Sequence, residues 1–118
     1  MNVFLFTFDY FITIKKYQQM EIKISKDPVP VISIEGRMDT GNTVIFEEAI
    51  APLLKSDTKE VIIDGTGLEY ISSSGLRQFL VLQKNIKEKG GSLTVRNLRA
   101  EIKDIFDLTG FTNIFTIV

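Results

Sequence analysis

The stretch from Val61 to Leu76, VIIDGTGLEYISSSGL, indicates the fold of this chain. Its first three residues, VII, form a short apolar run typical of a central strand buried on both faces. The following DGTG, residues 64–67, predicts the end of that strand, because glycine and aspartate interrupt regular structure. Ser72, Ser73 and Ser74 precede a long amphipathic segment, and serine at this place is a helix N-cap signal. The stretch therefore predicts a strand, a turn and a helix that begins beside a row of hydroxyl groups.

The residues on either side alternate between strand and helix patterns. The expected order is a hairpin at 21–25 and 29–34, a helix with its apolar arc at 45–54, the central strand, a helix at 74–89, a strand at 92–96, a short helix around 102–106 and a last strand at 114–118. Pro52 should bend or shorten the first helix, because proline lacks a backbone N–H. This order predicts an α/β fold, with a mixed, mostly parallel sheet of about five strands and three helices.

Three smaller expectations concern individual side chains. Tyr70, between Leu68 and Ile71, is expected to enter the core. Asp39, Thr40 and Asn42 are all candidate caps for the first helix, because short polar side chains can accept hydrogen bonds from the unpaired N–H groups at a helix start. Val81 lies outside the buried stripe of the 74–89 helix, on the outward side with Arg77, Asn85 and Glu88.

The amino-acid composition of the chain excludes several classes of function. With 118 residues and a net charge of −1, the chain fits one domain without the basic surface that nucleic acid or an anionic membrane would attract. It contains no cysteine and no histidine, so a disulfide, a thiol nucleophile and a Ser-His-Asp triad are excluded. We therefore expect no enzyme activity, no metal and no cofactor, and a cytoplasmic protein in which Ser73 is a substrate rather than a nucleophile.

Residues 1–19 differ from the rest of the chain in their aromatic content. Phe4, Phe6, Phe8 and Tyr10 recur at a period of two, and the apolar run is too short for a membrane-spanning helix. One interpretation is an upstream start codon, so that the domain proper comprises residues 20–118. The other is an extra strand that joins the sheet or pairs two protomers into a homodimer.

Three motifs resemble those of STAS domains, the anti-sigma factor antagonist family. The family signature is matched by Asp64, Thr66, Tyr70, Ile71, Ser73, Gly75 and Leu76. The sequence Gly36-Arg37-Met38-Asp39 resembles the family's Gly-x-apolar-Asp turn, and residues 97–111 resemble its last helical section. The chain departs from the pattern at Ser72, where the sporulation-type antagonists carry aspartate. It also lacks the final helix with which family members usually end.

The resemblance implies a STAS-type fold and a phosphorylation switch. Ser73 would be phosphorylated by an anti-sigma factor serine kinase, and only the unmodified form would bind that kinase tightly and free the sigma factor. A phosphatase would reverse the modification. The expected partner-binding residues are Asp39, Asp64, Ser72 and Ser74 around Ser73. Arg77 and Val81 are added because helical spacing places them on the outward side of the same helix.

From the residues themselves, other roles stay open at these positions. Ser74 is the expected helix cap, Ser72 a neighbour that replaces an acid, and Asp64 a residue that bonds its own turn. Asp39 fits a helix cap as well as a partner contact. The alternative function is a STAS scaffold subunit of a lipid-transport ABC complex or a signalling assembly, which binds its partner without being phosphorylated.

Overall fold

The computed structural model describes residues 20–26 and 28–118, so the expectations for residues 1–19 lie outside the described part. The strands are β1 Met20–Ser25, β2 Val31–Met38, β3 Glu60–Ile71, β4 Ser92–Arg96 and β5 Thr116–Ile117. The helices are α2 Thr43–Lys55, α3 Ser73–Glu88 and α4 Ala100–Leu108, followed by a 3₁₀ turn, η1, at Phe111–Asn113. The predicted α/β class is confirmed, and the last strand is shorter than the predicted 114–118.

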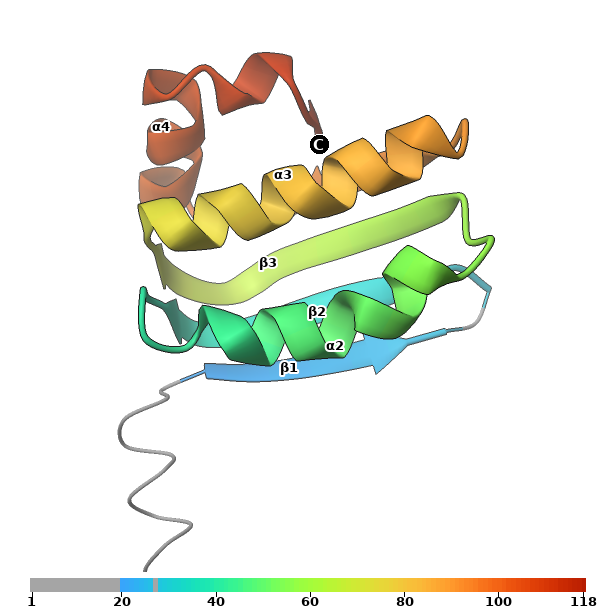
Figure 1. Cartoon of the computed structure of the whole chain (residues 1–118). Helices are drawn as coiled ribbons and strands as arrows, with labels where there is room; N and C mark the ends of the chain where they lie inside the picture. The colour runs from blue at the N-terminus through green and yellow to red at the C-terminus, as the bar shows by residue number, and fades with distance from the viewer. Residues whose placement is uncertain (1–19, 27) are drawn as a thin grey trace, which may run out of the picture.

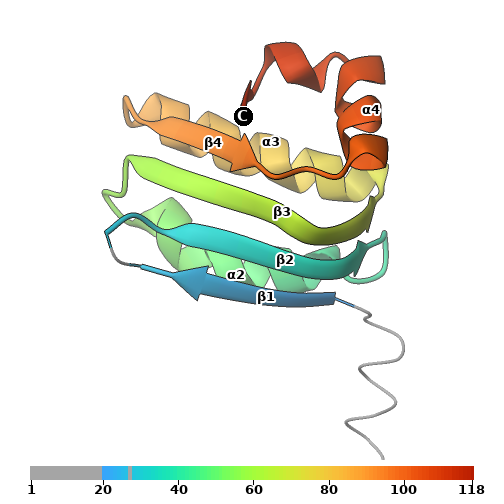
Figure 2. The same cartoon turned by 180° about the vertical axis from the view of Figure 1, so that it is seen from behind.

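The five strands form one sheet in the order β1-β2-β3-β4-β5. β1 runs antiparallel to β2, and the other neighbouring pairs are parallel, as the hairpin and the helical crossovers predict. Helices α2 and α3 lie side by side on one face of the sheet (Figure 1), and from behind the strands stand in front of both helices (Figure 2). The layer between the helices and the sheet holds the hydrophobic core.

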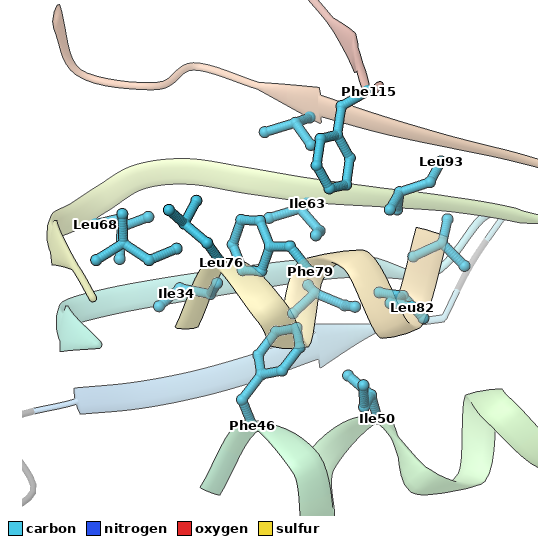
Figure 3. Close-up of a cluster of buried hydrophobic side chains, with 14 of the residues drawn as sticks. Ile34, Phe46, Ile50, Ile63, Leu68, Leu76, Phe79, Leu82, Leu93 and Phe115 are labelled. Atoms are coloured by element: carbon cyan, nitrogen blue, oxygen red, sulfur yellow. The ribbon is translucent and has the colours of Figure 1, made fainter. Parts of the chain in front are cut away.

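Phenylalanine side chains join the helical layer to the sheet. The ring of Phe79 on α3 lies 5.5 Å from that of Phe46 on α2, 6.1 Å from Phe106 on α4 and 6.4 Å from Phe115 before β5, measured between centroids. Figure 3 shows Phe46, Phe79 and Phe115 pointing into the same space. Because these rings come from four segments, one cluster fixes how α2, α3 and α4 pack.

The prediction that residues 64–67 end the central strand is wrong, because β3 continues without a break to Ile71. Its glycines permit close approach instead of a turn. A Cβ atom on Gly65 would lie 2.7 Å from Leu98 Cδ2, and one on Gly67 would lie 2.7 Å from Glu35 Cγ and 3.0 Å from the Ile34 carbonyl oxygen. The pairing of β2 with β3 is irregular at this point, between Ser33 and Glu35.

Helix α2 also runs further than the proline suggested, since Pro52 lies inside it and the helix ends at Lys55. The side chains of Asn85 on α3 and of Lys89, the residue that follows α3, bind carbonyl groups in the last turn of α2. Lys89 Nζ donates to Leu53 O at 3.0 Å and to Leu54 O at 3.2 Å, and Asn85 Nδ2 donates to Leu54 O at 3.1 Å. Leu53 O also accepts from Ser56 N at 3.2 Å and from Ser56 Oγ at 2.8 Å. Carbonyl groups at a helix C-terminus lack intrahelical donors, so these bonds together stabilise the last turn.

Candidate functional site

Ser72 forms the turn between β3 and α3. Its backbone is extended, with φ −84° and ψ 171°, and its Oγ accepts a hydrogen bond from Gly75 N at 3.1 Å. Its own N–H donates to Met38 O at the end of β2, at 2.8 Å. The side chain is 7% exposed. Ser72 is therefore the N-cap of α3, and the expectation that Ser74 would be the cap is wrong.

Ser73 and Ser74 occupy the first two positions of α3. Ser73 is exposed, whereas Ser74 is half-buried. The first N–H groups of a helix have no intrahelical acceptor, and the helix dipole places partial positive charge at this end. The serine with its side chain most open to another protein thus stands where a negative charge is favoured.

Gly75 brings the first turn of α3 down onto the ends of the strands. It is buried, and a Cβ at this position would lie 2.8 Å from Ile71 Cγ1 and 3.0 Å from Met38 Cγ. The absence of a side chain at Gly75 therefore allows the start of α3, with its serines, to pack closely on the ends of the strands.

The loop between β2 and α2 lies beside this turn, because Met38 bonds Ser72 and Asp39 follows Met38. Asp39 Oδ1 accepts from Gly41 N at 2.8 Å and from Asn42 N at 3.0 Å. Asn42 Oδ1 accepts in turn from Asp39 N at 2.9 Å, and its Nδ2 donates to Arg37 O at 2.8 Å. Asp39 thus shapes the turn before α2, and Figure 1 shows the starts of α2 and α3 at the same end of the sheet.

Arg77 and Val81 lie further along α3, both exposed, with Val81 at 42%. Helical spacing places them on the outward side, 160° and 200° from Phe79 by about 100° per residue, with Ser73 at about 120°. The predicted outward position is therefore confirmed for Arg77 and Val81, which share one surface with Ser73. It is wrong for Asn85, which is half-buried and donates to Leu54 O on α2.

Asp64 does not belong to this surface. It precedes Ile71 by seven strand residues, a rise of roughly 23 Å. Its Oδ2 pairs with Arg96 Nε at 3.3 Å, and its Oδ1 accepts from Thr66 N at 2.9 Å and Thr66 Oγ1 at 2.6 Å. Burial acts to raise the pKa of Asp64, but the hydrogen bonds from Thr66 and Arg96, with the Arg96 charge, leave that pKa lowered. The carboxylate binds Thr66, two residues further along the chain, as expected from the residues alone, but it does so within the continuous strand β3 and not in a turn.

Tyr70 is a surface residue that sequence reasoning placed in the core. It is 36% exposed, and the guanidinium of Arg37 lies 4.3 Å from the centre of its ring. The register shift between Gly36 and Arg37 turns the side chain outward, so the alternation along β3 does not predict its direction. Tyr70 and Arg37 thus form a further exposed pair at the strand ends that lead into the serine row.

The cap assignment predicts different outcomes for neighbouring serines. Ser72→Ala should lower the free energy of unfolding by about 1 kcal/mol, because Gly75 N loses its acceptor in a buried place. Ser74→Ala, the matched control, should stay within about 0.5 kcal/mol of wild type. Urea denaturation of both variants measures the difference. Equal losses, or a larger loss for Ser74→Ala, would contradict the assignment.

The described residues thus form an α/β domain with a mixed, mostly parallel sheet. An exposed serine, Ser73, follows the buried cap residue at the turn from β3 into α3. The STAS domain family model matches residues 19–118, and the chain belongs to this family. No helix within residues 20–26 and 28–118 has the length and apolar character needed to cross a membrane.

Individual relatives agree with this membership. The chain is 29% identical over 100 residues to the anti-sigma-B factor antagonist of Bacillus subtilis, covering 83% of this chain and 88% of that protein. The crystal structure of an anti-sigma factor antagonist from Mycobacterium paratuberculosis superposes with a TM-score of 0.76 at 21% identity, over 85% of this chain and 86% of that one. The Bacillus cell fate determinant SpoIIAA in its phosphorylated form gives a TM-score of 0.65 at 14% identity, over 83% and 91%.

Proposed function

We propose that this protein is an anti-sigma factor antagonist whose binding to an anti-sigma factor serine kinase is switched off by phosphorylation of Ser73. One observation carries the proposal: within the serine row, Ser72 is committed to a buried cap bond and Ser73 is exposed on the first turn of α3. Relatives named as anti-sigma factor antagonists support the partner class. The protein acts in the cytoplasm, and a phosphatase restores the unmodified form.

The position of Ser73 favours a switch that alters the surface and leaves the fold intact. A phosphoserine adds about −1.5 to −2 charges near neutral pH. At the start of α3, free N–H groups and the helix dipole stabilise such a charge. The modification therefore enlarges the surface and makes it anionic, while the buried Ser72 cap and the core beneath it are unchanged.

The proposed partner surface is centred on α3. It comprises Ser73, Ser74, Arg77 and Val81, with Asp39 on the neighbouring loop. Ser72 contributes by holding the turn, since it is 7% exposed. Asp64 lies outside this surface, and its role in partner binding stays a prediction without geometric support.

The serine at position 72 is compatible with a switch. The sporulation-type antagonists, which this chain resembles, have aspartate at the position that corresponds to Ser72. Serine and aspartate are about equally effective N-caps, so Ser72 preserves the turn that presents Ser73. In the scaffold alternative, Ser73 is never modified and the partner is a lipid-transport ABC complex or a signalling assembly.

Ser73→Asp should weaken binding to the kinase at least tenfold, or about 1.4 kcal/mol, because it places a negative charge at the centre of the interface. The same substitution should leave the free energy of unfolding within about 0.5 kcal/mol of wild type or slightly above it, since the helix start favours an anion. A binding titration and a melting curve on the same preparation measure both quantities. Loss of both together would show that Ser73 is structural, and unchanged binding would favour the scaffold alternative.

A further inference from the structure

Arg77 is the arginine of this chain whose guanidinium has no partner among residues 20–26 and 28–118. The chain contains four arginines, all in the described part. Arg96 pairs with Asp64, Arg99 Nε donates to Thr66 O at 3.3 Å, and Arg37 stacks on Tyr70. Arg77 is exposed and makes no ion pair or hydrogen bond to a described side chain. Its charge is therefore available.

The position of Arg77 relative to Ser73 suits an ion pair between the two side chains once Ser73 carries a phosphate. Both belong to α3, four residues apart, so their Cβ atoms lie on neighbouring turns about 6 Å from each other. An acid that precedes a base by four residues has the favourable orientation for a helical ion pair. A guanidinium also matches phosphate oxygens with two parallel N–H donors, which a lysine cannot do.

We propose that Arg77 captures the phosphate of phosphoserine 73 within the same chain. This inference rests on the proposed phosphorylation of Ser73 and adds a second component to the switch. In the unmodified protein the guanidinium is free on the partner surface beside Val81. In the modified protein it folds back onto the phosphate, so modification both adds negative charge and withdraws a positive group from the surface.

The intramolecular pair has a consequence for specificity. A partner that binds the free Arg77 guanidinium is excluded in two ways. The guanidinium is occupied by the phosphate, and the negative charge of the phosphate repels an acidic partner surface. A phosphatase must open the pair to reach the phosphorus atom. Ser73→Asp reproduces the charge only in part, because a single carboxylate one bond shorter offers fewer acceptors to Arg77.

The test uses the full chain with phosphoserine installed at position 73 during translation, so no kinase is needed. Phosphorus NMR follows the second ionisation of the phosphate between pH 4 and 9, near its ordinary value of about 6. An adjacent guanidinium favours the dianion, so Arg77→Gln should raise this pKa by about 0.3. Arg77→Lys should retain part of the effect, because it keeps the charge but not the fork.

Lys84→Gln is the matched control. Lys84 is exposed on the same side of α3 but lies eleven residues from Ser73, about 16 Å along the axis and beyond the Debye length in 0.1 M salt. In the Lys84→Gln variant, the pKa of the phosphate on residue 73 should equal that of the chain without this substitution. A change below about 0.1 for Arg77→Gln, or an equal change for Lys84→Gln, would overturn the inference.

The outcome is independent of the proposed function. If cells never phosphorylate Ser73, the titration of the installed phosphoserine is unaffected. If Ser73 is the switch but Arg77 does not capture the phosphate, Ser73→Asp still weakens kinase binding while the Arg77→Gln pKa stays unchanged.

Discussion

Phe79→Ala is expected to lower the free energy of unfolding by about 3–5 kcal/mol, a large part of the stability of a domain of this size. Phe79 is fully buried, and its ring lies within 6.4 Å of three other phenylalanine rings. Its removal leaves a cavity between α2, α3 and α4 that rigid neighbouring segments cannot fill.

Val81→Ala on the same helix is the control for this substitution. Val81 is 42% exposed, so its truncation should change the unfolding free energy by no more than about 0.5 kcal/mol. Urea denaturation midpoints with unchanged slope would give both values. A loss below about 1.5 kcal/mol for Phe79→Ala would show that the aromatic cluster is not the centre of the core.

Gly91→Ala is the second substitution with a large expected effect, at about 3 kcal/mol or more. A Cβ at Gly91 would lie 1.9 Å from the carbonyl oxygen of Lys59 and 2.6 Å from its carbon. The obstacle is backbone, so β4 must move away from β3 at its first residue. The hydrogen bond from Ser92 N to Lys59 O, 2.7 Å long, would be lost with it.

The adjacent glycine separates steric from conformational effects. Gly90 has φ +77° and open space around its Cβ position, so Gly90→Ala should cost only about 1–2 kcal/mol for the left-handed backbone. Thermal or urea unfolding of the two variants gives the comparison. A Gly90→Ala loss equal to or larger than that of Gly91→Ala would contradict the close packing of Gly91 on Lys59.

The order of elements was predictable because it depends on local periodicity. The outward position of Val81 follows from the helical repeat, and the assignment of SLTVR to a strand follows from its alternating pattern. Both predictions are confirmed. Ser73 is exposed, as its place at the strand-to-helix turn suggests, while its role as the phosphorylated residue stays a prediction. Features of this kind depend on residues close together in the chain.

The errors lie where distant residues decide. Gly65 and Gly67 suggested a strand break, yet β3 continues through them. They lie where a Cβ atom would meet Leu98 and Glu35 at close range. Three consecutive serines offered three caps, and the bond from Ser72 N to Met38 O selects the first of them. The glycine contacts and the Ser72–Met38 hydrogen bond join residues that are distant in the chain, so local sequence patterns do not predict them. The same is true of the Asp64–Arg96 pair, whose residues are 32 positions apart.

The central claim is that Ser73 is the phosphorylated residue, and phosphopeptide mapping of the protein isolated from its native host tests it most directly. We expect phosphate on Ser73 and none on Ser72, whose hydroxyl is engaged with Gly75 N and 7% exposed. The Ser73→Ala protein isolated in the same way should carry no phosphate on this peptide. Phosphate on Ser74 or Ser72 with Ser73 unmodified, or a peptide that is never phosphorylated while the kinase still binds, would contradict the account.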